Sequence, residues 1–292
     1  MSPSAIPTVS VILNVFKRAQ NFERQLAALE SQSHPVTEIL VWENGEQTIQ
    51  NYLAGRPEVI LVRASTNLGV WARFSVALQA TGEFIWLIDD DVIPGRRWVE
   101  NALECFSQKP AVIGSRGLRF RSRHSYLLYD EYGPNNPNSN AQEVDIVGHN
   151  WIFPRSWLGA FWQLYSERFD SKFAGEDIHL SFAAKKILGV PTVVPPHPKN
   201  NHDLWGEISD LSLFDGHDDA AISSNPDSLR RFELAYRHYI NIGFQPIVSQ
   251  KVQTPIRAAI DSVIGKSVGK YPRFSLILAK KLGLRKRSKS SE

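Results

Sequence analysis

The stretch GEFIWLIDDDVIPG (residues 82–95) decides how this chain folds. Its run FIWLI is uniformly apolar and rich in β-branched and aromatic residues, which is typical of a strand buried on both faces of a parallel sheet. Three consecutive aspartates, Asp89, Asp90 and Asp91, follow the run directly. Because ligands of open α/β sheets bind beyond the carboxyl ends of the strands, this triplet is the first candidate for a functional site.

Strands and helices are expected to alternate on both sides of this stretch. The patterns predict further strands over 9–16, 37–45, 57–65, 111–120, 143–153 and 191–195, and helices over 20–33, 68–81, 177–188 and 228–243. Such alternation predicts a mostly parallel sheet flanked by helices, with right-handed crossovers. Residues 132–142, rich in Asn and Pro, are expected to form a long polar loop.

The composition is that of a globular protein with a sizeable core. The chain has 292 residues, of which 42% are hydrophobic. Its single cysteine, Cys105, excludes an intramolecular disulfide and a zinc site built from several cysteines. We find neither a signal-peptide pattern nor an uninterrupted apolar run of about 18 residues, so we expect a cytoplasmic location.

Charge divides the chain into an acidic body and a basic end. Residues 251–292 carry eleven Lys and Arg against two acids, whereas the other 250 residues have a net charge of −6. We expect one α/β domain over residues 6–245 and a basic helical extension over 246–292 with a disordered end. The alternating basic and apolar residues of 262–287 suit peripheral contact with anionic lipid or a solvated tail. They come with no nucleic-acid-binding motif, so we expect no nucleic-acid partner.

The aspartate triplet has the chemistry of a divalent-metal site. Adjacent ionised carboxylates repel one another, and burial at a strand end adds to that cost. In extended chain Asp89 and Asp91 point to the same side, so both can reach one cation. Oxygen ligands suit Mg²⁺ or Mn²⁺, which can also bind a diphosphate. The alternative is an acidic turn before the bend at 92–95.

Three parts of the chain together resemble the GT-A glycosyltransferases of the family 2 type. They are VSVILNVFKRAQNFERQLAALESQ (9–32) with EILVWENG (38–45), NLGVWARFSVALQATGEFIWLIDDDVIPG (67–95), and GEDIHLSFAAKK (175–186). Their order matches that family's nucleotide-binding strand, acidic metal motif and acidic base motif. The resemblance implies a GT-A-like (Rossmann-like) fold. It also implies transfer of a hexose or N-acetylhexosamine from a UDP- or GDP-type donor to a hydroxyl of a saccharide, lipid-linked or protein-linked acceptor.

The resemblance also implies a set of donor-binding residues. These are Val15, Arg18, Glu43, Asn44, Asn67, Gly69, Arg73, Asp89 and Asp90. Gly69 would let the backbone approach the ligand, and Arg73 would suit a diphosphate, although a solvated helix face explains Arg73 equally well. Glu43-Asn44-Gly45 replaces the family's double-Asp and is also a favourable turn sequence.

Catalytic, sugar-binding and metal-binding residues follow from the same resemblance. Asp177 would be the general base that deprotonates the acceptor, and Glu176 would orient the acceptor, although acids at a helix start also cap it. The sugar-contacting candidates are His149, Asn150 and Trp151, of which the aromatic residue suits the core as well. The metal ligands would be Asp89 and Asp91 with His197, a residue that a purely structural role also explains.

Three alternatives stay open from the sequence. VWENG (41–45) and VDIVGHNWIF (144–153) are similar to exostosin-like glycosyltransferases, which retain anomeric configuration. A catalytically inactive sugar-nucleotide-binding protein, tethered to a membrane by the basic end, would keep the same donor site. A nucleotidyltransferase would need a Gly-rich phosphate loop near the first strand, and the sequence has none there.

Overall fold

The computed structural model describes residues 6–16, 18–45, 49–53, 56–208, 226–247 and Val263. The strands run β1 Val9–Val15, β2 Glu38–Asn44, β3 Val59–Ala64, β4 Phe84–Ile88, β5 Val112–Phe120, β6 Tyr129–Tyr132, β7 Gln142–Val144, β8 Ile146–Pro154 and β9 Thr192–Val194. The α-helices run α1 Phe22–Glu30, α2 Ala72–Val76, α3 Trp98–Gln108, α4 Leu158–Gln163, α5 Glu176–Ala183 and α6 Pro226–Asn241. Short 3₁₀ turns cover Ala19–Asn21, Gln50–Leu53, Ala77–Gln79, Arg155–Trp157, Tyr165–Glu167 and His202–Leu204, and a π-turn covers Ala184–Leu188.

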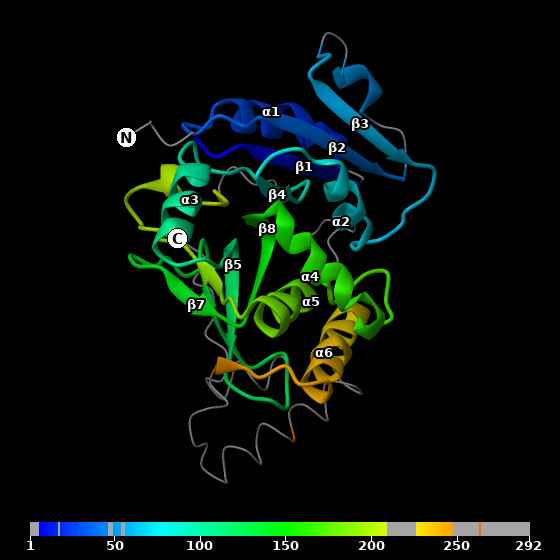
Figure 1. Ribbon diagram of the computed structural model, residues 1–292, viewed down its shortest axis with the longest axis vertical. Helices are drawn as coiled ribbons and strands as arrows, with labels where there is room; N and C mark the ends of the chain where they lie inside the picture. The colour runs from blue at the N-terminus through cyan, green and yellow to red at the C-terminus, as the bar shows by residue number, and fades with distance from the viewer. Residues whose placement is uncertain are drawn as a thin grey trace.

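These strands form one mixed sheet in the order β3-β2-β1-β4-β8-β5-β9-β7, with β6 beside β5 (Figure 1). Strands β1 to β4 are parallel to one another, as the strand–helix alternation predicts. The second half differs, because β8 runs antiparallel between β4 and β5. The segment expected as one strand over 143–153 is two strands, which separate at Asp145. Its carboxylate accepts the main-chain N–H groups of Phe120 and Ile247.

Alternation along β1 sorts its side chains into two apolar layers. Val9, Val11 and Leu13 pack with the apolar residues of α1 and α3, whereas Ile12 packs on the opposite face with α2 and α4. A third cluster joins α5 to α6 through residues such as Ile178 and Tyr239. The sheet is therefore covered on both faces, which agrees with the uniformly apolar strands of the first half.

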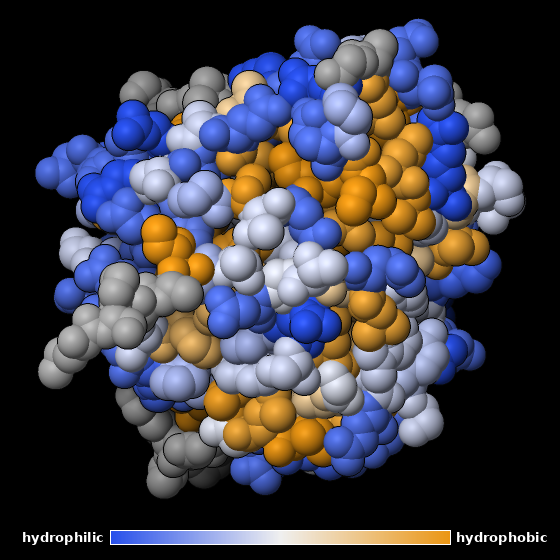
Figure 2. All heavy atoms as spheres, turned by 45° about the horizontal axis from the view of Figure 1, so that its top comes forward, coloured by the Kyte–Doolittle hydropathy of each residue, from blue (hydrophilic) through white to orange (hydrophobic). Residues whose placement is uncertain are grey.

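Strand β3 ends the sheet on one side and leaves apolar side chains exposed. Figure 2 shows a broad apolar area on the side of the molecule that carries β3 and α2. Ile60 on β3 is exposed, and so are Leu68 and Leu78 before and after α2. Among the helices of the described segments, none is long and apolar enough to cross a membrane.

Two expectations about helices need comment. The helix expected over 68–81 begins only at Ala72, because Gly69 has φ +83° and Asn67 holds its N–H in a turn. The basic helical extension expected over 246–292 lies outside the described residues, apart from 246–247 and Val263, and stays a prediction.

Candidate active site

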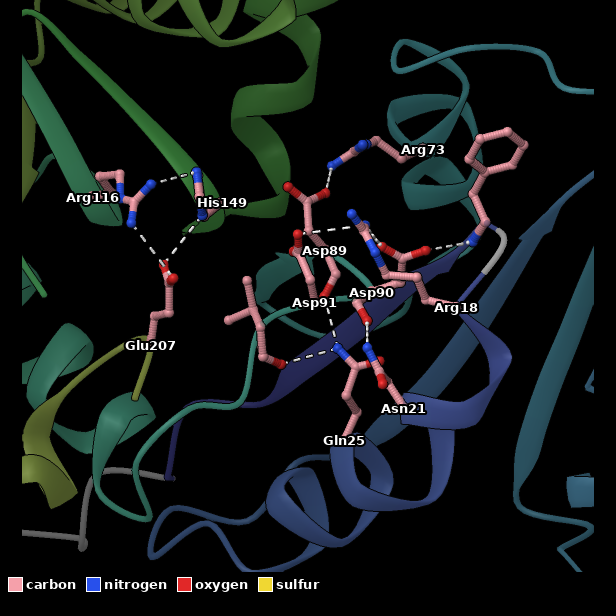
Figure 3. Close-up of polar contacts among 12 residues, drawn as sticks. Arg18, Asn21, Gln25, Arg73, Asp89, Asp90, Asp91, Arg116, His149 and Glu207 are labelled. Carbon is pink, nitrogen blue, oxygen red and sulfur yellow. Dashed lines mark hydrogen bonds and ion pairs between the residues drawn. The ribbon is translucent and has the colours of Figure 1, made fainter. Parts of the chain in front are cut away.

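The aspartate triplet lies directly beyond β4, and its middle member turns into the protein. Asp90 is 4% exposed and accepts the N–H of Phe16 at 2.8 Å and a guanidinium N–H of Arg18 at 2.7 Å (Figure 3). Burial raises the pKa of Asp90 to about 7, although Arg18 acts in the opposite direction. Asp90 therefore fixes the end of β1 to the end of β4, and with it the nucleotide side of the expected donor site.

The side chains of Asp89 and Asp91 are less buried than that of Asp90. Asp89 pairs with Arg73 and its side chain remains 25% exposed. Asp91 lies 3.4 Å from Arg18. Burial and the neighbouring charge of Asp89 raise the pKa of Asp91. A cation near these two carboxylates, in addition to Arg73 and Arg18, would thus be stabilising.

Helix α1 and the 3₁₀ turn that precedes it bind the main chain of the triplet. The side-chain amide of Gln25 donates to the carbonyl oxygens of Asp89 at 2.7 Å and Val92 at 2.9 Å. Asn21 donates to the carbonyl of Asp90 at 2.9 Å. These contacts satisfy buried backbone acceptors and fix the turn without using the carboxylates.

The candidate general base Asp177 and its neighbour Glu176 lie at the start of α5, directly after Gly175, which has φ +97°. Burial raises the pKa of Glu176 to about 8, and the charge of Asp177 adds to this effect. Burial also raises the pKa of Asp177, to about 6, while its Oδ1 accepts the N–H of Ile178 at 2.7 Å. Arg73 interacts with both Asp89 and Glu176. The start of α5 and the end of β4 therefore meet across the Arg73 guanidinium.

A tight contact ties the loop before α2 to the segment before α5. The N–H of Val70 donates to the carbonyl of Lys172 at 2.9 Å, and the indole N–H of Trp71 donates to the carbonyl of Ser171 at 2.7 Å. A Cβ on Gly69 would lie 2.0 Å from the Lys172 oxygen. Gly69 is therefore required for this close approach.

Several expected donor contacts are instead used inside the protein. Glu43 is buried and accepts the N–H of Ile49 and the Nε–H of Arg63. Asn44 accepts the N–H of Leu68 and donates to the carbonyl of Gly69. The side-chain oxygen of Asn67 accepts the N–H of Gly69 in a turn, and Val15 is buried in the core. Glu43 and Asn44 thus end β2 with side chains that bond within the protein, and their contact with a nucleotide stays a prediction.

The sugar-contacting candidates on β8 differ from one another. Asn150 is fully buried and donates to the carbonyl of Gly206 at 2.7 Å, and Trp151 donates to the carbonyl of Val147 at 2.8 Å while lying against Arg73. Both belong to the core rather than to an open surface. His149 is partly exposed. Its φ is +65°, and among the residues that the structure describes no other non-glycine residue has a positive φ.

His149 contacts two residues that the sequence patterns did not single out. Its Nε2 lies 3.1 Å from the guanidinium of Arg116, and its Nδ1 lies 3.1 Å from Oε2 of Glu207 (Figure 3). Burial alone would raise the pKa of Glu207, but Arg116 and His149 outweigh it and lower that pKa to about 2. Neither residue stands in a recognisable motif, so only the fold brings them to the site.

The expectation that His197 binds metal is not supported by its surroundings. His197 is fully buried; its Nδ1 lies 2.8 Å from the carbonyl of Pro195, and its Nε2 accepts the N–H of Gly206 at 3.1 Å. Burial lowers its pKa to about 4, so the ring is neutral and structural. We therefore assign His197 to the packing of the segment after β9.

Replacing His149 should separate the effects of its backbone and its ring. A non-glycine residue at positive φ costs on the order of 1 kcal/mol or more, and glycine adopts this conformation without that cost. We expect His149→Gly to unfold at a higher denaturant concentration than His149→Ala, with a free energy of unfolding that is larger by about 1 kcal/mol. At Arg119, within β5, the same pair of variants should show the opposite order, because glycine weakens a strand. Equal stabilities of the two His149 variants would contradict the strained backbone.

The comparisons with known proteins decide the family. The model of glycosyl transferase family 2 matches residues 10–162, more than half of the chain. This chain belongs to glycosyl transferase family 2. Its fold is that of the GT-A glycosyltransferases, and the matched residues contain the triplet, Arg18 and Arg73.

Individual relatives are distant. Glycosyltransferase AglE of Haloferax volcanii is 30% identical over 112 residues, which are 36% of this chain and 37% of that protein. The chain thus spans little more than a third of the curated relative that it matches. Among solved structures, GalNAc-T7 with UDP, GalNAc and Mn²⁺ overlaps 66% of this chain and 43% of its own at 11% identity and a TM-score of 0.53. This likeness shows the fold. Mannosyltransferase PcManGT of Pyrobaculum calidifontis, in complex with GDP-Man and Mn²⁺, overlaps 96% of this chain and 74% of its own at 16% identity and a TM-score of 0.49.

Proposed function

We propose that this glycosyltransferase moves a sugar from a UDP- or GDP-type nucleotide sugar onto an acceptor hydroxyl, with inversion at the anomeric carbon and with a divalent cation. One observation carries the proposal. The carboxylates of Asp89 and Glu176 both interact with the guanidinium of Arg73, and Asp177 lies close enough to Asp89 for the charge of Asp89 to act on it. A donor bound at this edge would have its diphosphate beside cationic groups and its sugar beside a candidate base.

The residues fit a Mn²⁺ or Mg²⁺ that is shared with the substrate. Asp89 and Asp91 supply two carboxylates with charges of the same sign. Burial and the charge of Asp89 raise the pKa of Asp91. No group of three or more His, Cys, Asp or Glu side chains in the described segments could hold a metal by itself. Mg²⁺-type sites commonly combine one or two carboxylates with phosphate oxygens and water. When bound, the cation would stabilise the negative charge that develops on the leaving diphosphate.

The chain's own residues would perform the remaining chemistry. Asp177, with a pKa of about 6, is ionised near neutral pH and can accept the proton of the acceptor hydroxyl. Glu176, with a pKa of about 8, is then protonated and can donate a hydrogen bond that orients the acceptor. Arg73 and Arg18 lie where they can stabilise the diphosphate. A retaining mechanism remains the alternative, and it would not need Asp177 as a base.

These two pKa values predict a bell-shaped dependence of transfer on pH. The base acts when ionised, so activity should rise with pH through about 6, whereas an aspartate with the ordinary pKa of 3.8 would be ionised at a much lower pH. Activity should fall again as Glu176 loses its proton near pH 8. We expect kcat/KM to follow both limbs, and Glu176→Gln to remove only the upper one. A profile that stays flat down to about pH 5 would contradict the assignment of the base.

A thermal-shift screen tests the donor and the metal together. Purified protein would be heated with UDP-, GDP-, CMP- and dTDP-sugars, each with and without Mn²⁺. A donor at about 100 times its dissociation constant adds roughly 2.7 kcal/mol of stability, so the shift is readily measured. We expect a Mn²⁺-dependent shift with a UDP- or GDP-sugar. The absence of any shift across the screen would overturn the proposed donor site.

A further inference from the structure

Three side chains from distant parts of the chain close a triangle beside the aspartate triplet. Arg116 comes from β5, His149 from β8, and Glu207 from the segment 203–208 that follows β9, which we name the strap. Arg116 lies 3.1 Å from His149 and 3.6 Å from Glu207, and His149 lies 3.1 Å from Glu207 (Figure 3). The side chain of Glu207 is 5% exposed, so this is a buried ionic cluster rather than a surface pair.

The triangle engages both nitrogens of the histidine ring. Nε2 of His149 faces the guanidinium of Arg116, and Nδ1 faces the carboxylate of Glu207. Both ring nitrogens are thus committed within the protein. His149 would have to break one of these contacts to bind a sugar hydroxyl, as the sequence led us to expect.

The backbone of His149, by contrast, contacts the triplet directly. Its carbonyl accepts the N–H of Asp89 at 3.2 Å, which extends the β4–β8 ladder by one bond. This carbonyl is oriented by the left-handed conformation at φ +65°. The register of β5 against β8 shifts between Gly114 and Arg116, close to the same point. A change of conformation at His149 would therefore move the start of the triplet.

The strap also binds the far end of the loop 89–97, which begins with the triplet and which we name the aspartate loop. The N–H groups of Gly95 and Arg97 donate to carbonyls of Trp205 and Asp203 at 2.8 and 2.7 Å, and the N–H of Ile208 donates to the carbonyl of Ile93 at 2.9 Å. The packing is close, since a Cβ on Gly95 would lie 2.5 Å from the carbonyl oxygen of Asp203 in the strap. Through its main-chain neighbours and its side chain, Glu207 connects both ends of the aspartate loop.

We propose that Glu207 and Arg116 are positioning residues, which hold His149 in its left-handed conformation and thereby set the arrangement of Asp89 and Asp91 for the cation and the donor. This inference rests on the proposed function, because it assigns a role toward the proposed metal site. It places no part of the triangle in contact with the reacting atoms. It differs from the sequence expectation, in which His149 contacts the sugar itself.

A double-mutant cycle between Glu207→Gln and His149→Gly tests the inference. Glycine adopts the left-handed conformation without a ring, so it should no longer need the triangle. The affinity of the full chain for Mn²⁺ would be titrated by electron paramagnetic resonance with saturating UDP and, separately, GDP. We expect Glu207→Gln to weaken Mn²⁺ binding by about tenfold in the wild type, the usual scale for groups behind metal ligands. In the His149→Gly background the same change should have an effect below about twofold, given that the coupling is removed.

Controls distinguish this role from others. Arg116→Met should weaken Mn²⁺ binding in the wild-type background, and this weakening should likewise disappear in the His149→Gly background. Glu233→Gln removes another buried carboxylate, paired with Arg237 on α6, and should leave Mn²⁺ affinity unchanged even if it lowers the melting temperature. Equal weakening by Glu207→Gln in both backgrounds would overturn the positioning role in favour of direct electrostatic action. An unchanged affinity in the wild-type background would overturn it in favour of packing alone. Failure of the wild type to bind Mn²⁺ with either nucleotide would instead remove the proposed function.

Discussion

Asp177→Asn should lower the rate of sugar transfer by a factor on the order of 10² or more, while donor affinity stays nearly constant. The amide keeps the shape of the carboxylate and its contact with the N–H of Ile178, but it cannot accept the proton of the acceptor hydroxyl. The loss should therefore appear in kcat. The measurement is steady-state transfer with the donor that the thermal-shift screen identifies, alongside a donor titration of the same variant.

The controls for this prediction lie close by in the chain. Asp170→Asn changes a side chain that is 99% exposed and should leave transfer unaffected. Glu176→Gln should cost less than Asp177→Asn, because an amide can still donate a hydrogen bond to the acceptor. Transfer at the wild-type rate in Asp177→Asn would remove this residue from the mechanism, and the retaining alternative would then be favoured.

The second large effect is expected from Asp91→Asn, which should abolish the Mn²⁺-dependent part of donor binding. Burial and Asp89 already disfavour the charge of Asp91, as the raised pKa indicates. The neutral amide should therefore leave the metal-free protein as stable as the wild type or slightly more so. Calorimetry or thermal shift with donor, with and without Mn²⁺, would record both changes. A gain in intrinsic stability with a loss of the metal response is the trade-off expected for a functional carboxylate.

A surface pair provides the comparison for Asp91. Glu143→Gln breaks the exposed contact with Lys109 and should change neither stability nor the metal response appreciably. Donor affinity that still responds fully to Mn²⁺ in Asp91→Asn would contradict the metal role of the triplet. Stability that falls sharply in the absence of metal would show that Asp91 has a structural function instead.

The first half of the fold could be predicted because its signals are local. The strands that end at Val15, Asn44 and Ile88 begin and end within three residues of the expected positions, and each is buried on both faces. The functional ends of these strands were recognisable for the same reason, since Asp89 to Asp91 follow an apolar strand without a gap. The start of α5 was equally visible, with Gly175 and two acids before an apolar helix.

The remainder depends on pairings between distant segments. The antiparallel position of β8 between β4 and β5 leaves no local mark, and neither does the break at Asp145, whose carboxylate bonds to residues 25 and 102 positions away. Helix α3 was missed, although it follows the triplet closely. Arg116 and Glu207 are ordinary charges in the sequence and become interesting only when the strap places them beside His149.

The contact between Gly69 and Lys172 has a consequence for anyone who wishes to recombine this enzyme with a relative. The loop before α2 and the segment before α5 share hydrogen bonds and leave no room for a Cβ between them. A chimaera that joins the first half of one enzyme to the second half of another would have to reproduce both surfaces of this contact at once. Exchange of donor and acceptor specificity by swapping whole halves should thus fail unless residues 69–71 and 171–172 are inherited from the same parent.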